Sequence, residues 1–262
     1  MEKKRILFYE ICPMTYAISL NKEIIKRNIR NILNGEHFSK KRSPQSMPAV
    51  IASYSGEMIK KGPGIDLQLQ LNKAKNIEPA CSKIDGVVIE PGESFSFWHY
   101  VGKTSHGNGL SEGRLIVNGK LISGTGGGLC NLANTLNLLV MHSPLTITEI
   151  HNSDALAPDP DNKYTPYGAG TSVNYNFIDY GFRNDTDQPV QLRTWCDGSI
   201  LKAELRSIKE YPYNYRIVGE DHHFHKEENG KFYRKSKIYR ETIDKATNKV
   251  ISRELKWNNL PR

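Results

Sequence analysis

The chain has 262 residues, 38% of them hydrophobic and 24% charged, a composition typical of a soluble globular protein with a proper hydrophobic core. The formal net charge of +8 comes from scattered basic clusters, which leaves peripheral membrane contact open and argues against a specific nucleic-acid partner. No segment approaches the ~18 apolar residues of a membrane span, and no signal-peptide core follows Met1. We therefore expect a cytoplasmic protein.

Residues 1–64 predict an N-terminal segment of helix and loop. Between residues 13 and 33, isoleucines recur at helical spacing and would share one helix face, namely Ile18, Ile25, Ile29 and Ile32. Asn34-Gly35 would end this helix. Residues 39–48 are rich in Ser, Pro and Lys and predict a loop.

Residues 65–206 predict a central domain in which helices and strands alternate. Asp66 is a suitable N-cap for a helix that runs to about Asn76, and Asn118-Gly119 predicts a hairpin turn. A glycine run, Gly124 to Gly128, leads into a helix with an apolar stripe over 129–141. Strands are predicted over 86–89, 95–98, 115–117, 145–151, 171–183, 190–195 and 200–205, with a loop over 152–167.

Residues 207–262 predict β-hairpins that turn at Asn229-Gly230 and near Thr247-Asn248. The expected fold is therefore α+β: N-terminal helices, a glycine-rich loop leading into a helix packed on an antiparallel sheet, and C-terminal hairpins. In the first hairpin, His223 and His225 would share a strand face and could form a metal pair, but charged residues follow them directly. A solvated hairpin end is the favoured interpretation for His222, His223 and His225, and we expect no metal and no cofactor.

The four cysteines are widely spaced and form no zinc pattern. Cys130 differs from the others because it lies in the first turn of the predicted 129–141 helix. A helix N-terminus carries partial positive charge and unpaired N–H groups, which favour a thiolate and could hold an oxyanion near Gly128 and Leu129. Cys130 is therefore the candidate nucleophile.

A thiol nucleophile also needs a base and a group that orients the base. His151 closes the strand after the helix, and Asp179 interrupts the apolar face of the next predicted strand. The order of Cys, His and Asp resembles the transglutaminase-like branch of papain-type folds. Under this hypothesis Cys130 attacks, His151 takes the proton and Asp179 orients His151.

Other interpretations of these residues compete with the catalytic hypothesis. Cys130 could be a packing residue, and the glycines could serve only a tight turn. The glycine run fits neither a Walker A loop nor the dinucleotide fingerprint. An anion nest remains open, which would make Gly126, Gly127, Gly128, Asn131 and Asn134 the ligand-binding residues.

Several motifs, taken in order, resemble the VanW-like family, which is named for an accessory protein of some vancomycin-resistance clusters. They span roughly residues 65–205 and are Pro91–Trp98, Asn118–Leu121, Gly126–Cys130 and Asp179–Asp187. The resemblance implies a cell-envelope or glycopeptide-resistance context. It does not imply a settled reaction.

Two departures from the family pattern bear on catalysis. Family members usually carry Gln directly after the motif Cys, where this chain has Asn131. Many carry a His at the position of Ser153, two residues beyond His151. If that later His is the family's base, this chain lacks it.

Two functions from different classes follow. The first is a cysteine-dependent acyl-transfer or amide-hydrolysing enzyme that acts on a peptide related to cell-wall precursors. The second is a non-catalytic accessory module that binds an anionic precursor or a protein partner. The state of Cys130 discriminates between them, because an enzyme needs an exposed, low-pKa thiol with a His in reach.

Overall fold

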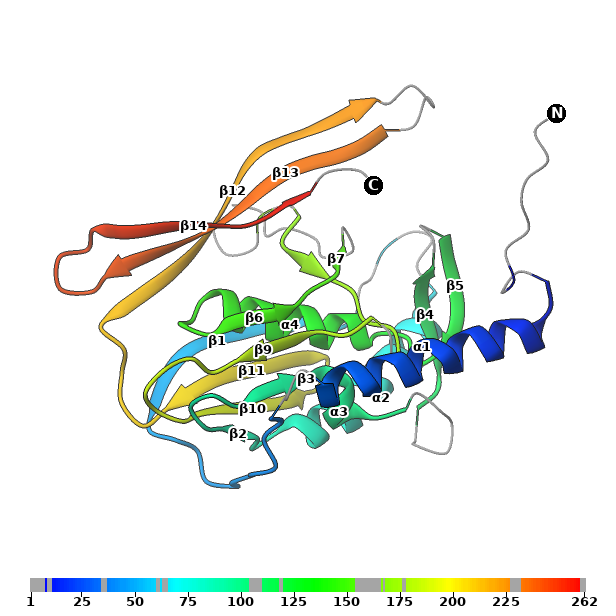
Figure 1. Ribbon diagram of the computed structural model, residues 1–262, viewed down its shortest axis with the longest axis horizontal. Helices are drawn as coiled ribbons and strands as arrows, with labels where there is room; N and C mark the ends of the chain where they lie inside the picture. Colours follow the sequence, from blue (N-terminus) through cyan, green and yellow to red (C-terminus); the bar gives the residue numbers. More distant parts are fainter. Residues whose placement is uncertain are drawn as a thin grey trace.

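The structure, a computed structural model, describes residues 8, 11–33, 37–59, 62, 66–103, 110–117, 120–153, 166, 168–175, 178–226 and 232–259. Helices and antiparallel sheets alternate along the chain, which confirms the predicted α+β class (Figure 1). The helices of the described residues are α1 (Pro13–Leu33), α2 (Leu67–Ile84), α3 (Phe97–Val101) and α4 (Leu129–Met141).

A four-stranded antiparallel sheet, in the order β1-β11-β10-β2, supports the core. The register of β10 against β11 is set by the tight turn at Gly198, whose φ of 59° suits glycine. The first strand precedes α2 in the chain, yet it pairs with the strand that ends the predicted central region. The strands are β1 (Ala49–Glu57), β2 (Val88–Ile89), β10 (Val190–Asp197) and β11 (Ile200–Ser207).

Smaller sheets surround this one. The sheet β3-β9-β6 joins Ser94–Ser96, Gly181–Arg183 and Thr146–Glu149, in that order. Two further pairs are β4 (Glu112–Val117) with β5 (Lys120–Thr125), and β7 (Asn152–Ser153) with β8 (Gly170–Thr171). The C-terminal sheet consists of β12 (Tyr213–Lys226), β13 (Phe232–Asp244) and β14 (Val250–Asn259).

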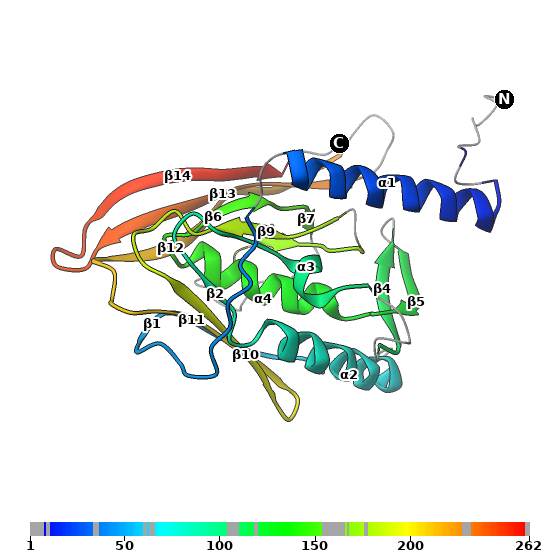
Figure 2. The same ribbon diagram turned by 60° about the horizontal axis from the view of Figure 1, so that its bottom comes forward.

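The core is built around α4, which lies between α2 and the strands β6 and β9 (Figure 2). Leucines on several sides of this helix are fully buried, which fits a helix enclosed by other elements. Its partners in the core come from α2 and from the four-stranded sheet. They include Ile77, Ile84, Leu192, Leu201 and Leu205.

The C-terminal sheet packs on the other end of α4 through a second apolar cluster of Leu138, Met141, Ile217 and Ile238. Arg240 strengthens this attachment, because its Nη1 donates to the carbonyl oxygens of Ser143 and Leu145 at 3.0 and 2.8 Å. From there the sheet extends along one side of the molecule (Figure 1).

Three predicted elements were wrong in extent or type. Helix α2 continues past Asn76 through Pro79, because the apolar stripe goes on to Ile84 and outweighs the lost hydrogen bond. Phe97 begins a helix and not a strand, because the Ser96 side chain caps the turn by accepting from the His99 amide.

The predicted strand over 171–183 was also wrong as one element. It is interrupted where the backbone of Asn174 exchanges two hydrogen bonds with Ile178, at 2.8 and 3.0 Å. The chain therefore reverses between β8 and β9. The strand β1 was missed, because Ser, Gly and Glu interrupt its apolar pattern.

Other local predictions are confirmed. Asp66 is the N-cap of α2, its carboxylate accepting from the Leu69 amide at 3.1 Å. The turn before β14 contains Asn248 with a φ of 54°. Ile18, Ile25 and Ile29 do share a face of α1, and that face is exposed. The predicted turns at Asn34-Gly35, Asn118-Gly119 and Asn229-Gly230 and most of the loop over 152–167 lie outside the described residues.

Candidate functional site

Cys130 lies in the first turn of α4, as the sequence predicts. Its thiol donates a hydrogen bond to the backbone oxygen of Val173, with a sulfur–oxygen distance of 3.6 Å. Burial raises the pKa of this thiol above its ordinary value. Cys130 is therefore a protonated, packed thiol in this conformation.

The glycines before Cys130 let helix α2 approach the turn closely. A Cβ atom at Gly128 would lie 2.3 Å from Cγ of Lys73, and the φ of Gly128 is +105°. Asn76 of the same helix donates from Nδ2 to the oxygen atoms of Gly127 and Ser111, both at 2.9 Å. The glycine turn is thus held from outside by α2.

The amides of this turn are largely engaged within the chain. The Gly126 amide donates to Ser111, the Leu129 amide to Gly126 and the Asn131 amide to Gly128. These bonds account for N–H groups that an anion nest would need. The contacts seen here are those of a packed turn. The ligand-binding role stays a prediction for Gly126, Gly127, Gly128 and Asn131.

Asn134, the last predicted ligand contact, links α4 to the segment that bears β8. Its Nδ2 donates to the Cys130 oxygen at 2.7 Å, and its Oδ1 accepts from the Thr171 amide at 2.7 Å. The side chain of Asn137, one turn further along, donates to Ala169 at 2.8 Å. Both asparagines thus orient the segment 169–173 against α4, including the carbonyl that receives the Cys130 thiol.

Asp179 is buried and accepts several hydrogen bonds. They come from Ser96 Oγ at 2.5 Å, Arg27 Nη2 at 3.0 Å, and the amides of Trp98 and Tyr180 at 3.1 and 2.8 Å. Burial raises the pKa of Asp179, against the lowering effect of Ser96, the Arg27 charge and the two amides.

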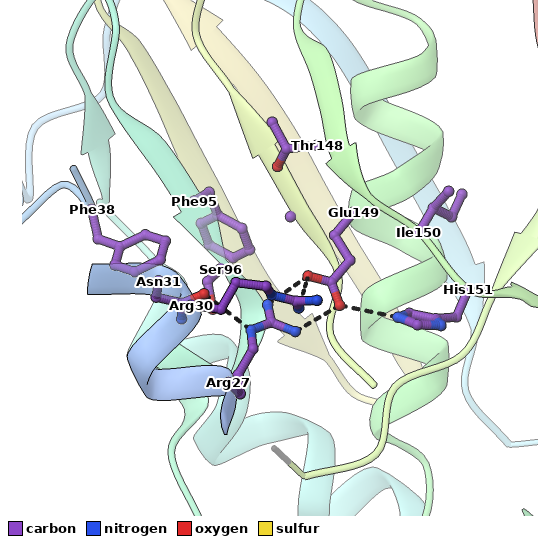
Figure 3. Close-up of a pocket in the computed structure, with 11 residues that line it drawn as sticks. Arg27, Arg30, Asn31, Phe38, Phe95, Ser96, Thr148, Glu149, Ile150 and His151 are labelled. Atoms are coloured by element: carbon purple, nitrogen blue, oxygen red, sulfur yellow. Dashed lines mark hydrogen bonds and ion pairs between the residues drawn. The ribbon is translucent and has the colours of Figure 1, made fainter. Parts of the chain in front are cut away.

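Glu149 of β6 joins Arg27 to His151. Arg27 contacts both carboxylate oxygens of Glu149, at 2.7 and 2.6 Å, and His151 Nε2 lies 3.0 Å from Oε1 (Figure 3). Burial alone would raise the pKa of Glu149, but the hydrogen bonds from His151 and Arg27 and the Arg27 charge lower it to about 2.

These groups line a pocket of about 560 Å³ between α1 and β6. In Figure 3 the side chains of Arg27, Glu149 and His151 form a continuous row from α1 to the end of β6. The aromatic rings of Phe38 and Phe95 lie at the other end of the pocket. The lining residues are Arg27, Arg30, Asn31, Phe38, Phe95, Ser96, Thr148, Glu149, Ile150, His151 and Gly181.

The structure gives the predicted triad a different set of contacts. Asp179 pairs with Arg27, and the carboxylate beside His151 is that of Glu149. Among the described residues, no hydrogen bond joins Cys130 to His151 or to Asp179. Asp179 therefore does not orient His151 here. Arg27 and Ser96 donate to its Oδ2, and two backbone amides donate to its Oδ1.

Sequence reasoning missed Arg27, Glu149 and Ser96. Glu149 had a readable signal, because residues two apart on a strand share a face and Glu149 precedes His151 by two. Arg27 had no such signal in the sequence, since it is 122 residues from Glu149 and 152 from Asp179.

Comparison with known sequences assigns the family. The sequence model of the family described as "VanW like protein" matches residues 72–206, about half of the chain. The chain belongs to the VanW-like family. The matched segment contains Cys130, Glu149, His151 and Asp179, whereas Arg27 and Arg30 lie before it.

Two curated relatives extend the comparison. The vancomycin B-type resistance protein VanW of Enterococcus faecalis is 28% identical over 218 residues, which cover 82% of this chain and 78% of that protein. The uncharacterized protein YoaR of Bacillus subtilis is 28% identical over 151 residues, 54% of this chain and 48% of its own length. No solved structure matches. Among the described residues, no helix is both long enough and apolar enough to cross a membrane.

We expect Gly128→Ala to destabilise the protein more than Gly92→Ala. Both glycines have positive φ, so each substitution costs about 1–2 kcal/mol of backbone strain. Only Gly128 has a neighbour in the way, since nothing lies within 4 Å of a Cβ at Gly92. Urea unfolding measures the difference in the free energy of unfolding between the two variants. Equal losses of stability would show that α2 moves away from residue 128 without destabilising the protein.

We expect Arg27→Met to lower the free energy of unfolding at neutral pH by about 3 kcal/mol, because it leaves the buried carboxylate of Asp179 and the half-buried carboxylate of Glu149 without their guanidinium partner. Arg30→Met is the matched control. The side chain of Arg30 is 58% exposed and lies 3.8 Å from Glu149, so its loss should cost under about 1 kcal/mol.

The same pair of variants tests the low pKa of Glu149. A carboxylate with a depressed folded-state pKa stabilises the protein above its unfolded pKa, and this contribution is lost as the pH falls through the folded pKa. In the wild type, this contribution should be lost between about pH 4.5 and the folded pKa of about 2. Arg27→Met should show a shallower loss than Arg30→Met in urea titrations over that range; parallel curves would contradict the assigned cause.

Proposed function

We propose that this VanW-like protein is a non-catalytic accessory module in a glycopeptide-resistance or cell-envelope context. Its ligand would be a charged peptide related to cell-wall precursors, bound in the pocket between α1 and β6. The observation that carries the proposal is the state of Cys130. Its thiol is half-buried, donates to a backbone carbonyl and has a raised pKa.

These features are the opposite of what thiol catalysis requires. The thiolate is the nucleophile, and it needs a base within hydrogen-bond reach. His151 instead contacts Glu149, and Asp179 contacts Arg27 and Ser96. A packing role for Cys130 explains its contacts without further assumptions.

The pocket has the chemistry of a binding site for a ligand that carries both charges. Arg30 is exposed at its rim and could receive a carboxylate. Glu149 and His151 offer an acceptor and a titratable ring beside it. The half-buried Phe38 adds apolar surface, and a volume of about 560 Å³ suits a short peptide.

The context of the proposal comes from the relatives. The Enterococcus faecalis relative is named for vancomycin B-type resistance, and its similarity extends over most of both chains. A peptide with a free C-terminus carries a carboxylate, and its N-terminus or a lysine side chain adds an amine. Both groups have a candidate partner in the pocket.

We expect Cys130 to react slowly with iodoacetamide in the native protein, and more slowly than Cys12 by about tenfold or more, because thiolate content and access control the rate. Cys12 is the internal reference, since hydrogen bonds from the amide and the hydroxyl of Thr15 lower the pKa of its thiol. Mass spectrometry of each cysteine across a pH series provides the measurement.

The control is His151→Ala. In the accessory module, this change leaves the Cys130 rate unaltered. The enzyme hypothesis makes the contrary prediction: Cys130 reacts fastest at neutral pH and slows in His151→Ala. That result would overturn the proposal and redirect the search to acyl-transfer substrates.

We expect a short synthetic lysine-containing peptide with a free C-terminal carboxylate to bind the pocket and raise the melting temperature of the protein. Arg30→Met should weaken this binding about tenfold or more by removing the carboxylate partner. Lys22→Met is the matched control, because it removes a charge from α1 outside the pocket. Equal losses in both variants, or no binding by the wild type, would contradict the assignment of the pocket.

A further inference from the structure

The apolar stripe of α1 faces solvent. Its side chains recur at helical spacing along the start of the chain and are each between 51% and 69% exposed. They are Ile11 just before the helix, then Met14, Ile18, Ile25 and Ile29 within it. A helix on the surface of a globular protein ordinarily turns such a stripe toward the core.

Helix α1 contacts the body of the protein through the opposite side. Arg27 is nine residues beyond Ile18, which is two and a half turns at about 3.6 residues per turn and so half-way round the helix. Its side chain is only 6% exposed and pairs with Glu149 and Asp179. The helix is therefore held by a polar side chain, while its apolar side is left for another partner.

The charges beside the stripe indicate what that partner is. Lys22 and Lys26 lie along one edge of the stripe, and Lys3, Lys4 and Arg5 come shortly before it in the sequence. Lys26 forms an exposed ion pair with Glu23, at 2.9 Å. An apolar stripe bordered by lysines is the pattern of a helix that lies in a lipid–water interface, where lysine stems follow the apolar surface and the ammonium groups meet anionic headgroups.

A second copy of the chain fits this stripe less well. A symmetric contact brings the same patch of both molecules together. Lys22 lies at the edge of the stripe about half-way along its length, so each copy would place this lysine close to its own counterpart. Like charges at the centre of a contact oppose association, whereas an anionic bilayer attracts them.

We propose that α1 binds the surface of an anionic lipid bilayer through the stripe of Ile11, Met14, Ile18, Ile25 and Ile29. The helix lies parallel to the membrane, and Lys22 and Lys26 contact anionic headgroups. Because Arg27 is on the opposite side, the helix keeps its ion pairs with Glu149 and Asp179 while the stripe is buried in lipid.

The test is co-sedimentation of the full chain with vesicles of phosphatidylcholine alone or with added phosphatidylglycerol. We expect binding to the anionic vesicles, weak binding to the neutral ones, and loss of binding at high salt. The triple variant Ile18→Ser, Ile25→Ser, Ile29→Ser should reduce the partition coefficient about tenfold or more. Its melting temperature should match that of the wild type, since all three side chains are exposed.

The matched control is the triple variant Val250→Ser, Ile251→Ser, Leu255→Ser, which removes similarly exposed apolar side chains from β14. It should bind anionic vesicles like the wild type. The proposal is overturned if the wild type does not bind them, or if the two triple variants bind equally. It is also overturned if light scattering shows a wild-type dimer that the α1 variant alone dissociates, because a second copy then covers the stripe.

Discussion

The close contact between α2 and the glycine turn is the constraint on which the centre of the molecule depends. Gly128 has no side chain to keep Lys73 away, and Asn76 holds the turn by three hydrogen bonds, to Ser111 and Gly127. This contact fixes where α4 begins, and α4 is the helix around which the core is packed. The same contact places Cys130 beneath the segment 169–173 and so removes its thiol from much of the solvent.

Burial opposes the effect that the helix N-terminus has on the ionisation of Cys130. A cysteine at a helix N-terminus suggests a thiolate, because the helix dipole favours negative charge there. Removal from water opposes that effect, and for Cys130 it wins, since the pKa is raised. The charged groups of the region gather instead at the end of β6, where Glu149 contacts the guanidinium of Arg27 and the ring of His151. The electrostatic centre of the site is therefore this carboxylate and not the thiol.

The sequence predicted best what depends on near neighbours. The α4 helix, the Asp66 cap and the C-terminal hairpins are set by periodicity and turn residues within a few positions. The strand predicted over 171–183 failed because a local reversal at Asn174 carries no glycine or proline. The pairing of Arg27 with Asp179 could not be predicted at all, because it joins a surface helix to a strand end across most of the chain. The sequence predicted that Asp179 orients His151. In the structure two groups stand between them, namely Arg27, which lies outside the family segment, and Glu149, which lies inside it.

The two sides of α1 connect the pocket with its surroundings. Arg27 and Arg30 lie on the side of the helix that lines the pocket. The exposed isoleucines lie on the other side, where the bilayer surface is proposed to bind. Helix α1 is 21 residues long, or about 30 Å at 1.5 Å per residue. A surface bound along its apolar side would be separated from the pocket by the diameter of the helix. A ligand anchored in that surface would reach Arg30 before it reached Glu149, because Arg30 is exposed and Glu149 lies behind Arg27. The order of these charges from the helix inward would then favour a ligand that presents its carboxylate first.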